Sequence, residues 1–105
     1  MTGIPQEERE ARYLATMALD RLLADAPPCT AQEAVEAIRQ VVALRDGLVA
    51  QRRQAGASAE LDRRLTEANA VLSLTWSGVV PVTGFRRQRL QKARAALDEA
   101  TAEAE

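Results

Sequence analysis

The sequence predicts an all-α protein, an antiparallel four-helix bundle built around a long helical hairpin. Three observations lead to this class. Apolar residues recur at helical spacing along four segments, short breaks containing Pro or Gly separate those segments, and a length of 105 residues suits a single domain. We therefore expect helices over residues 6–26, 31–54, 59–76 and 84–103, within one helical domain that spans 1–105.

The first helix should begin after Pro5 and end ahead of Pro27 and Pro28. A proline suits the first turn of a helix, whereas a proline pair ends one, because proline lacks an N–H and disfavours helix in the preceding residue. The apolar residues of this segment recur at helical spacing and are predicted to face the core: Ala11, Tyr13, Leu14, Ala15, Met17, Ala18, Leu19, Leu22 and Leu23.

The second helix is predicted to start with a capping box. In Thr30-Ala31-Gln32-Glu33, the Thr hydroxyl can accept from the N3 amide while the Glu carboxylate reaches back to the N-cap amide. Gly47 lies inside this helix, where Gly costs about 1 kcal/mol relative to Ala. Because the apolar pattern keeps its phase beyond Gly47, we expect a continuous helix, with any kink falling at that residue.

The third and fourth helices are bounded by Gly56-Ala57-Ser58 and by the segment 76–85. Gly56 suits a left-handed C-cap, and Ser58 suits the N-cap of the next helix. Glu60 and Arg64 form an i,i+4 pair. Many core positions are alanine, which buries little apolar area, so we expect that a homodimer completes the core. The hairpin formed by the second and third helices is the expected dimer surface.

The composition excludes several functions. Without histidine, the usual Ser-His-Asp and Cys-His catalytic sites cannot form. With one cysteine, Cys29, the chain has neither the ligands for structural zinc nor an internal disulfide. Cys29 precedes a helix N-cap, where it could be an activated nucleophile or could pack on Ala34, and the second interpretation is favoured. We expect no enzyme, metal or cofactor.

Charge and hydropathy also bear on location and partners. The net charge of −1 argues against a dedicated nucleic-acid binder. Residues 1–10 lack the features of a signal peptide, and residues 68–85 are too interrupted to span a membrane. Abundant Ala and Arg with a single Lys is typical of GC-rich bacterial genomes. We expect a bacterial, cytoplasmic protein without membrane contact.

The segment 76–85 is the main candidate interaction site. Loops are normally polar, yet this one carries five large apolar residues: Trp76, Val79, Val80, Val82 and Phe85. They could dock a partner protein, since exposed aromatic residues dominate the energetics of interfaces. Alternatively, they could fold back and plug the end of a thin core. The two interpretations are compatible if the segment faces a second subunit.

Three arginines follow this segment at the start of the fourth helix. Arg86, Arg87 and Arg89 lie where the helix dipole is positive, which disfavours cations, so they could be matched to an anion. The alternative is that they are solvated or pair with acids of a neighbouring helix. The sequence thus predicts a small adaptor, chaperone or accessory subunit that binds another protein through residues 76–85. A regulator that binds an anionic ligand or nucleic acid through these arginines is the second hypothesis.

Overall fold

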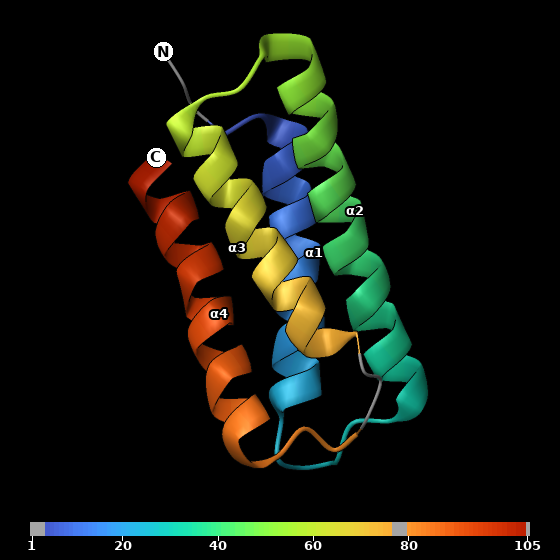
Figure 1. Ribbon diagram of the computed structural model, residues 1–105. Helices are drawn as coiled ribbons and strands as arrows, with labels where there is room; N and C mark the ends of the chain where they lie inside the picture. Colours follow the sequence, from blue (N-terminus) through green and yellow to red (C-terminus); the bar gives the residue numbers. More distant parts are fainter. Residues whose placement is uncertain (1–3, 77–79, 105) are drawn as a thin grey trace.

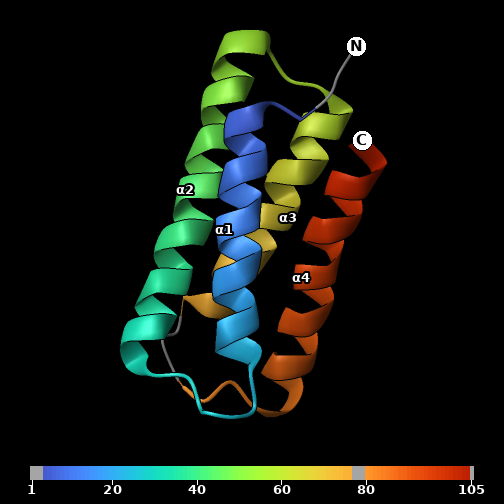
Figure 2. The ribbon, with the colours of Figure 1, turned by 180° about the vertical axis from the view of Figure 1, so that it is seen from behind.

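The computed structural model describes residues 4–76 and 80–104, with side-chain surroundings for 4–76 and 80–98. The described residues form four helices: α1 (Gln6–Leu23), α2 (Ala31–Ala55), α3 (Ala59–Thr75) and α4 (Gly84–Ala104). Each helix packs against the next in chain order, and α4 returns to pack against α1 (Figures 1 and 2). The predicted all-α, antiparallel four-helix bundle is therefore confirmed.

The helix ends follow the predicted capping residues with one difference. Thr30 and Glu33 form the expected capping box, Ser58 accepts from the Leu61 amide at 3.1 Å, and Gly56 has the expected positive φ of 83°. Arg21 also binds Glu33. The backbone hydrogen bond from Thr30 and the positive charge of Arg21 lower the pKa of Glu33.

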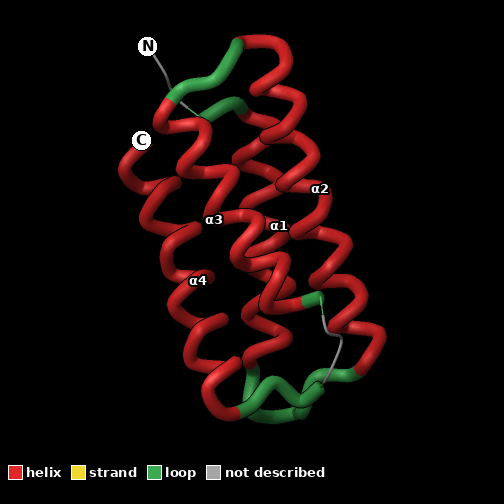
Figure 3. The backbone as a smooth tube through the Cα atoms, in the orientation of Figure 1, coloured by secondary structure: helices red, strands yellow, loops and turns green. Residues whose placement is uncertain are grey.

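The first helix ends at Leu23 rather than at residue 26. Ala24 is already extended, with a ψ of 139°, and the Pro27–Pro28 pair follows. The Leu23 carbonyl, which a longer helix would use internally, instead accepts a hydrogen bond from Arg87 of α4. The C-terminal ends of α1 and α3 thus lie at the same end of the bundle as the N-terminal ends of α2 and α4 (Figure 3).

The apolar core lies along the axis of the bundle and consists mainly of alanine, leucine and valine. Its buried members are Ala15, Leu19, Leu22, Cys29, Ala34, Ala37, Val41, Leu44, Leu48, Leu61, Ala68, Val71, Leu72, Val82, Leu90 and Leu97. The expected core stripe of α1 is partly wrong. Tyr13, Leu14 and Met17 are all exposed, because Glu8 and Arg12 occupy core-facing positions of that helix.

A buried charged cluster lies at the end of the bundle where α1 begins. We call Glu8, Arg12, Gln51 and Arg64 the Glu8 cluster. The Glu8 carboxylate accepts from Arg12 Nε at 2.7 Å, from Arg64 Nε at 3.0 Å and from Gln51 Nε2 at 2.7 Å. Arg12 Nη1 also donates to the Leu97 carbonyl oxygen of α4 at 3.2 Å. One carboxylate and its partners therefore join all four described helices.

The predicted Glu60–Arg64 pair is present at 3.2 Å, and it forms the outer part of this cluster. Arg64 is 6% exposed, so its main anionic partner is the buried Glu8 rather than the more exposed Glu60. A buried ion pair of this kind contributes little net stability when intact. Removal of one partner is costly, however, because an uncompensated charge stays behind.

We expect that Glu8→Gln lowers the free energy of unfolding by about 3–5 kcal/mol, because buried Arg12 and Arg64 lose the carboxylate that they share and Arg64 keeps only the more exposed Glu60. Urea denaturation followed by circular dichroism measures this change. The matched control is Glu7→Gln, at the exposed neighbouring position, which should change stability by less than about 0.5 kcal/mol. Equal effects of the two substitutions would contradict the role of Glu8.

The second helix runs without a break through Gly47, as predicted. Gly47 is exposed, and a Cβ added there would meet no described atom within 4 Å. We therefore expect Gly47→Ala to raise the free energy of unfolding by about 1 kcal/mol, since alanine restricts the unfolded chain and favours helix. Urea denaturation should show the opposite sign for Gly56→Ala, because Gly56 has a positive φ. A loss of stability in Gly47→Ala would contradict the continuous helix.

Candidate functional site

The segment 76–85 is divided by the structure into exposed aromatic residues and buried aliphatic ones. Trp76 is 66% exposed and Phe85 is 72% exposed, whereas Val82 is buried and Val80 packs against the core from a half-buried position. Val79 lies outside the described residues. The valines of the described part therefore close the end of the core, and the two aromatic residues are left on the surface.

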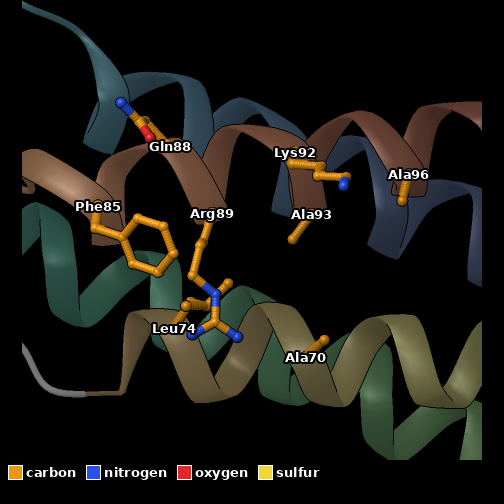
Figure 4. Close-up of a pocket in the computed structure, with 8 residues that line it drawn as sticks. All are labelled: Ala70, Leu74, Phe85, Gln88, Arg89, Lys92, Ala93 and Ala96. Atoms are coloured by element: carbon orange, nitrogen blue, oxygen red, sulfur yellow. The ribbon is translucent and has the colours of Figure 1, made fainter.

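Phe85 lies at a shallow groove between α3 and α4, which we call the α3–α4 groove (Figure 4). Its volume is about 590 Å³. Arg89 extends from α4 toward α3 beside the Phe85 ring, with its guanidinium carbon 5.8 Å from the ring centroid. The lining residues, none of which is acidic, are Ala70, Leu74, Phe85, Gln88, Arg89, Lys92, Ala93 and Ala96.

The composition of the groove gives it an apolar floor and a cationic rim. Ala70, Ala93 and Ala96 leave little side-chain bulk between the two helices, so a bound segment could approach the backbone closely. Arg89 and Lys92 are both exposed at its edge. Arg89 also makes a cation–π contact with the Phe85 ring, a type of contact that contributes about 0.5–1 kcal/mol at exposed sites.

Trp76 lines a different hollow, together with Arg45, Asn69, Leu72 and Ser73 of α2 and α3. The two aromatic residues predicted to form one docking site therefore contact different surfaces. A partner that buries both would have to wrap around the end of α3, which lies between α2 and α4 in the bundle.

The arginines at the start of α4 are directed to three different places. Arg86 Nε donates to the Leu74 carbonyl oxygen at 2.9 Å, and Arg87 Nη2 donates to the Leu23 carbonyl oxygen at 2.6 Å. Arg87 also pairs with Asp25 at 3.2 Å. Arg89 is the member of the trio that lies exposed over Phe85.

These contacts explain why cations are tolerated at the positive end of the α4 dipole. Leu23 and Leu74 lie in the last turns of α1 and α3, where backbone carbonyls have no partner within their own helix. A cation at a helix C-terminus is stabilised by the helix dipole. Arg86 and Arg87 therefore cap the C-terminal ends of α3 and α1, the two helices that contact α4. The sequence pattern identifies these arginines but does not predict their acceptors, because the acceptors lie 12 and 64 residues away in the chain.

We expect Arg87→Ala to lower the free energy of unfolding by about 1–2 kcal/mol, because the substitution removes a charge-assisted hydrogen bond that is partly shielded from water. Urea denaturation measures the loss. Arg89→Ala is the control, two residues further along α4, and should cost less than about 0.5 kcal/mol. If Arg87→Ala proved as mild as Arg89→Ala, the capping role of Arg87 would be wrong.

Cys29, which directly precedes the N-cap of α2, is buried. Cys29 and Ala34 both belong to the buried core, which agrees with packing at the start of α2.

Tyr13, Leu14 and Met17 form a second exposed apolar group, on the outer face of α1. None of the described helices combines the length and apolar character needed to cross a membrane.

No protein-family model, curated protein sequence or solved structure matches the chain.

Proposed function

We propose that the chain is a non-enzymatic protein–protein interaction module, such as a small bacterial cytoplasmic adaptor, chaperone or accessory subunit. Its partner docks at the α3–α4 groove. The observation that carries this proposal is the 72% exposure of Phe85 beside an apolar floor and two exposed cations. Aromatic residues and arginine are enriched at protein–protein interfaces, where a few such residues contribute most of the binding energy.

The shape of the groove favours an elongated protein segment over a small ligand. The groove is shallow and follows the contact of two helices, so it presents a strip rather than an enclosed cavity (Figure 4). Helix-in-groove recognition uses such strips, with apolar anchors along one face of the bound helix. Trp76 lies on a separate surface and can add a second contact.

Binding of an anionic ligand or nucleic acid by Arg86, Arg87 and Arg89 receives less support. Arg86 and Arg87 donate to backbone carbonyls of two different helices, so their guanidinium groups do not converge on one ligand position. An anion would have to displace these contacts. We therefore assign Arg89 to the docking surface and give Arg86 and Arg87 a structural role.

In-cell photocrosslinking tests the proposal. A photoreactive phenylalanine analogue at position 85 should give a discrete crosslinked species after irradiation, because Phe85 would be covered by the partner. The matched control carries the analogue at position 35, since Val35 is also an exposed apolar residue, on α2. Gel mobility and mass spectrometry identify the product. Equal crosslinking at both positions, or none at position 85, would refute the proposed docking surface.

A further inference from the structure

We propose that the segment bound at the α3–α4 groove is an acidic amphipathic helix of another protein, whose carboxylates pair with Arg89 and Lys92. This inference rests on the proposed function, because it names the chemistry of the partner at the same surface. The groove combines an apolar floor with two cations that the described part of the chain leaves without acidic partners.

Arg89 and Lys92 differ from most cations of the chain in their surroundings. Ion pairs with carboxylates involve Arg12, Arg21, Arg39, Arg45, Arg52, Arg64, Arg87 and Arg94. Within residues 4–76 and 80–98, neither Arg89 nor Lys92 has such a pair, although both lie exposed on the same groove. A second protein with carboxylates can therefore bind these cations without displacing a contact that holds the bundle together.

Arg53 is a further cation without a described carboxylate partner, and its position shows what is unusual about the groove. It lies in the last turn of α2, where the helix dipole favours a positive charge. Arg89 and Lys92 lie in the first half of α4, where no such compensation exists. Further along α3, Glu67 and Arg63 have opposite signs and cancel, so the net charge of the groove stays positive.

The line of groove residues along α4 fits a bound helix. Phe85, Arg89, Lys92 and Ala96 are separated by steps of 4, 3 and 4, which places them along one side of α4. At ~1.5 Å per residue, this line is about 16 Å long and corresponds to roughly three helical turns. The alanine side chains between α3 and α4 let another backbone approach closely. A bound helix of about three turns therefore covers the groove from Phe85 to Ala96.

The groove also specifies which residues the bound helix carries. Arg89 and Lys92 are three positions apart, so carboxylates three or four positions apart on one face of the bound helix can reach both. Apolar side chains of the same helix pack on Ala70, Ala93 and the Phe85 ring. A helix without carboxylates would cover the two cations and leave them uncompensated, which is costly. A nucleic acid would leave the apolar floor uncovered, and its binding normally requires a larger basic surface.

Charge reversal combined with photocrosslinking from position 85 tests the inference in cells. The test variant carries Arg89→Glu and Lys92→Glu. The matched control carries Arg39→Glu and Arg53→Glu, at two exposed positions of α2, so that both variants change the net charge equally. We expect the crosslink yield to fall by about 10-fold or more in the test variant, because carboxylates then face carboxylates. The control should keep the yield of the unaltered chain, and circular dichroism should show that both variants keep their helices.

Mass spectrometry of the crosslinked peptide then identifies the occupant, which should be a segment of another protein with the expected carboxylates. A synthetic peptide of that segment should bind the purified chain in a fluorescence anisotropy measurement at low ionic strength. The test variant should raise the dissociation constant by about 10-fold or more, and replacing the two carboxylates of the peptide by lysine should restore binding. This restoration cannot come from a misfolded variant.

The possible outcomes separate the acidic helix from the proposed function. A crosslink that persists at full yield in the test variant would overturn the acidic helix and leave the docking surface intact. A crosslink to a second copy of this chain, or to nucleic acid, would overturn it as well. Absence of a crosslink at position 85 in the unaltered chain would refute the proposed function and the acidic helix together.

Discussion

The carboxylate of Glu8 is the interaction on which the bundle most depends. Charged groups are seldom buried, because desolvation is costly, and they persist only where other charges and hydrogen bonds surround them. Glu8 has such surroundings from α1, α2 and α3, and Arg12 extends the contact to the backbone of α4. The rest of the buried core is leucine, alanine and valine with Cys29, whose contacts are non-directional. The Glu8 cluster adds directional hydrogen bonds that fit one arrangement of the four helices.

Most of the fold could be predicted from the sequence, because its helices are defined by local signals. The capping box at Thr30, the N-cap at Ser58 and the positive φ of Gly56 depend on neighbouring residues alone. The Glu8 cluster could not be predicted, since its partners Gln51 and Arg64 lie 43 and 56 residues away. A pattern of apolar residues assigns charged side chains to the surface, and here that assignment is wrong for three of them. The same error placed Leu14 and Met17 in the core.

The candidate site was predictable in its residue types but not in its geometry. An apolar segment followed by arginines drew attention to one end of the bundle. The pattern could not separate Val82, which closes the core, from Phe85, which lies on the surface. Nor could it separate Arg86 and Arg87, which bind helix C-termini, from Arg89, which lies over an aromatic ring. Side chains only one to three positions apart have different roles because successive positions of a helix face different directions.

The contacts of α4 at both ends of the bundle have a consequence for how the protein loses its structure. Detachment of α4 alone would remove Arg86 and Arg87 from two helix ends and the Leu97 carbonyl from Arg12, which is 2% exposed. A three-helix remnant would therefore contain unpaired carbonyls and a guanidinium group without its backbone acceptor. Such a partly open state is raised in free energy, so amide protons in the middle turns of α4, between Arg87 and Leu97, should exchange more slowly than those at the helix ends, which fray.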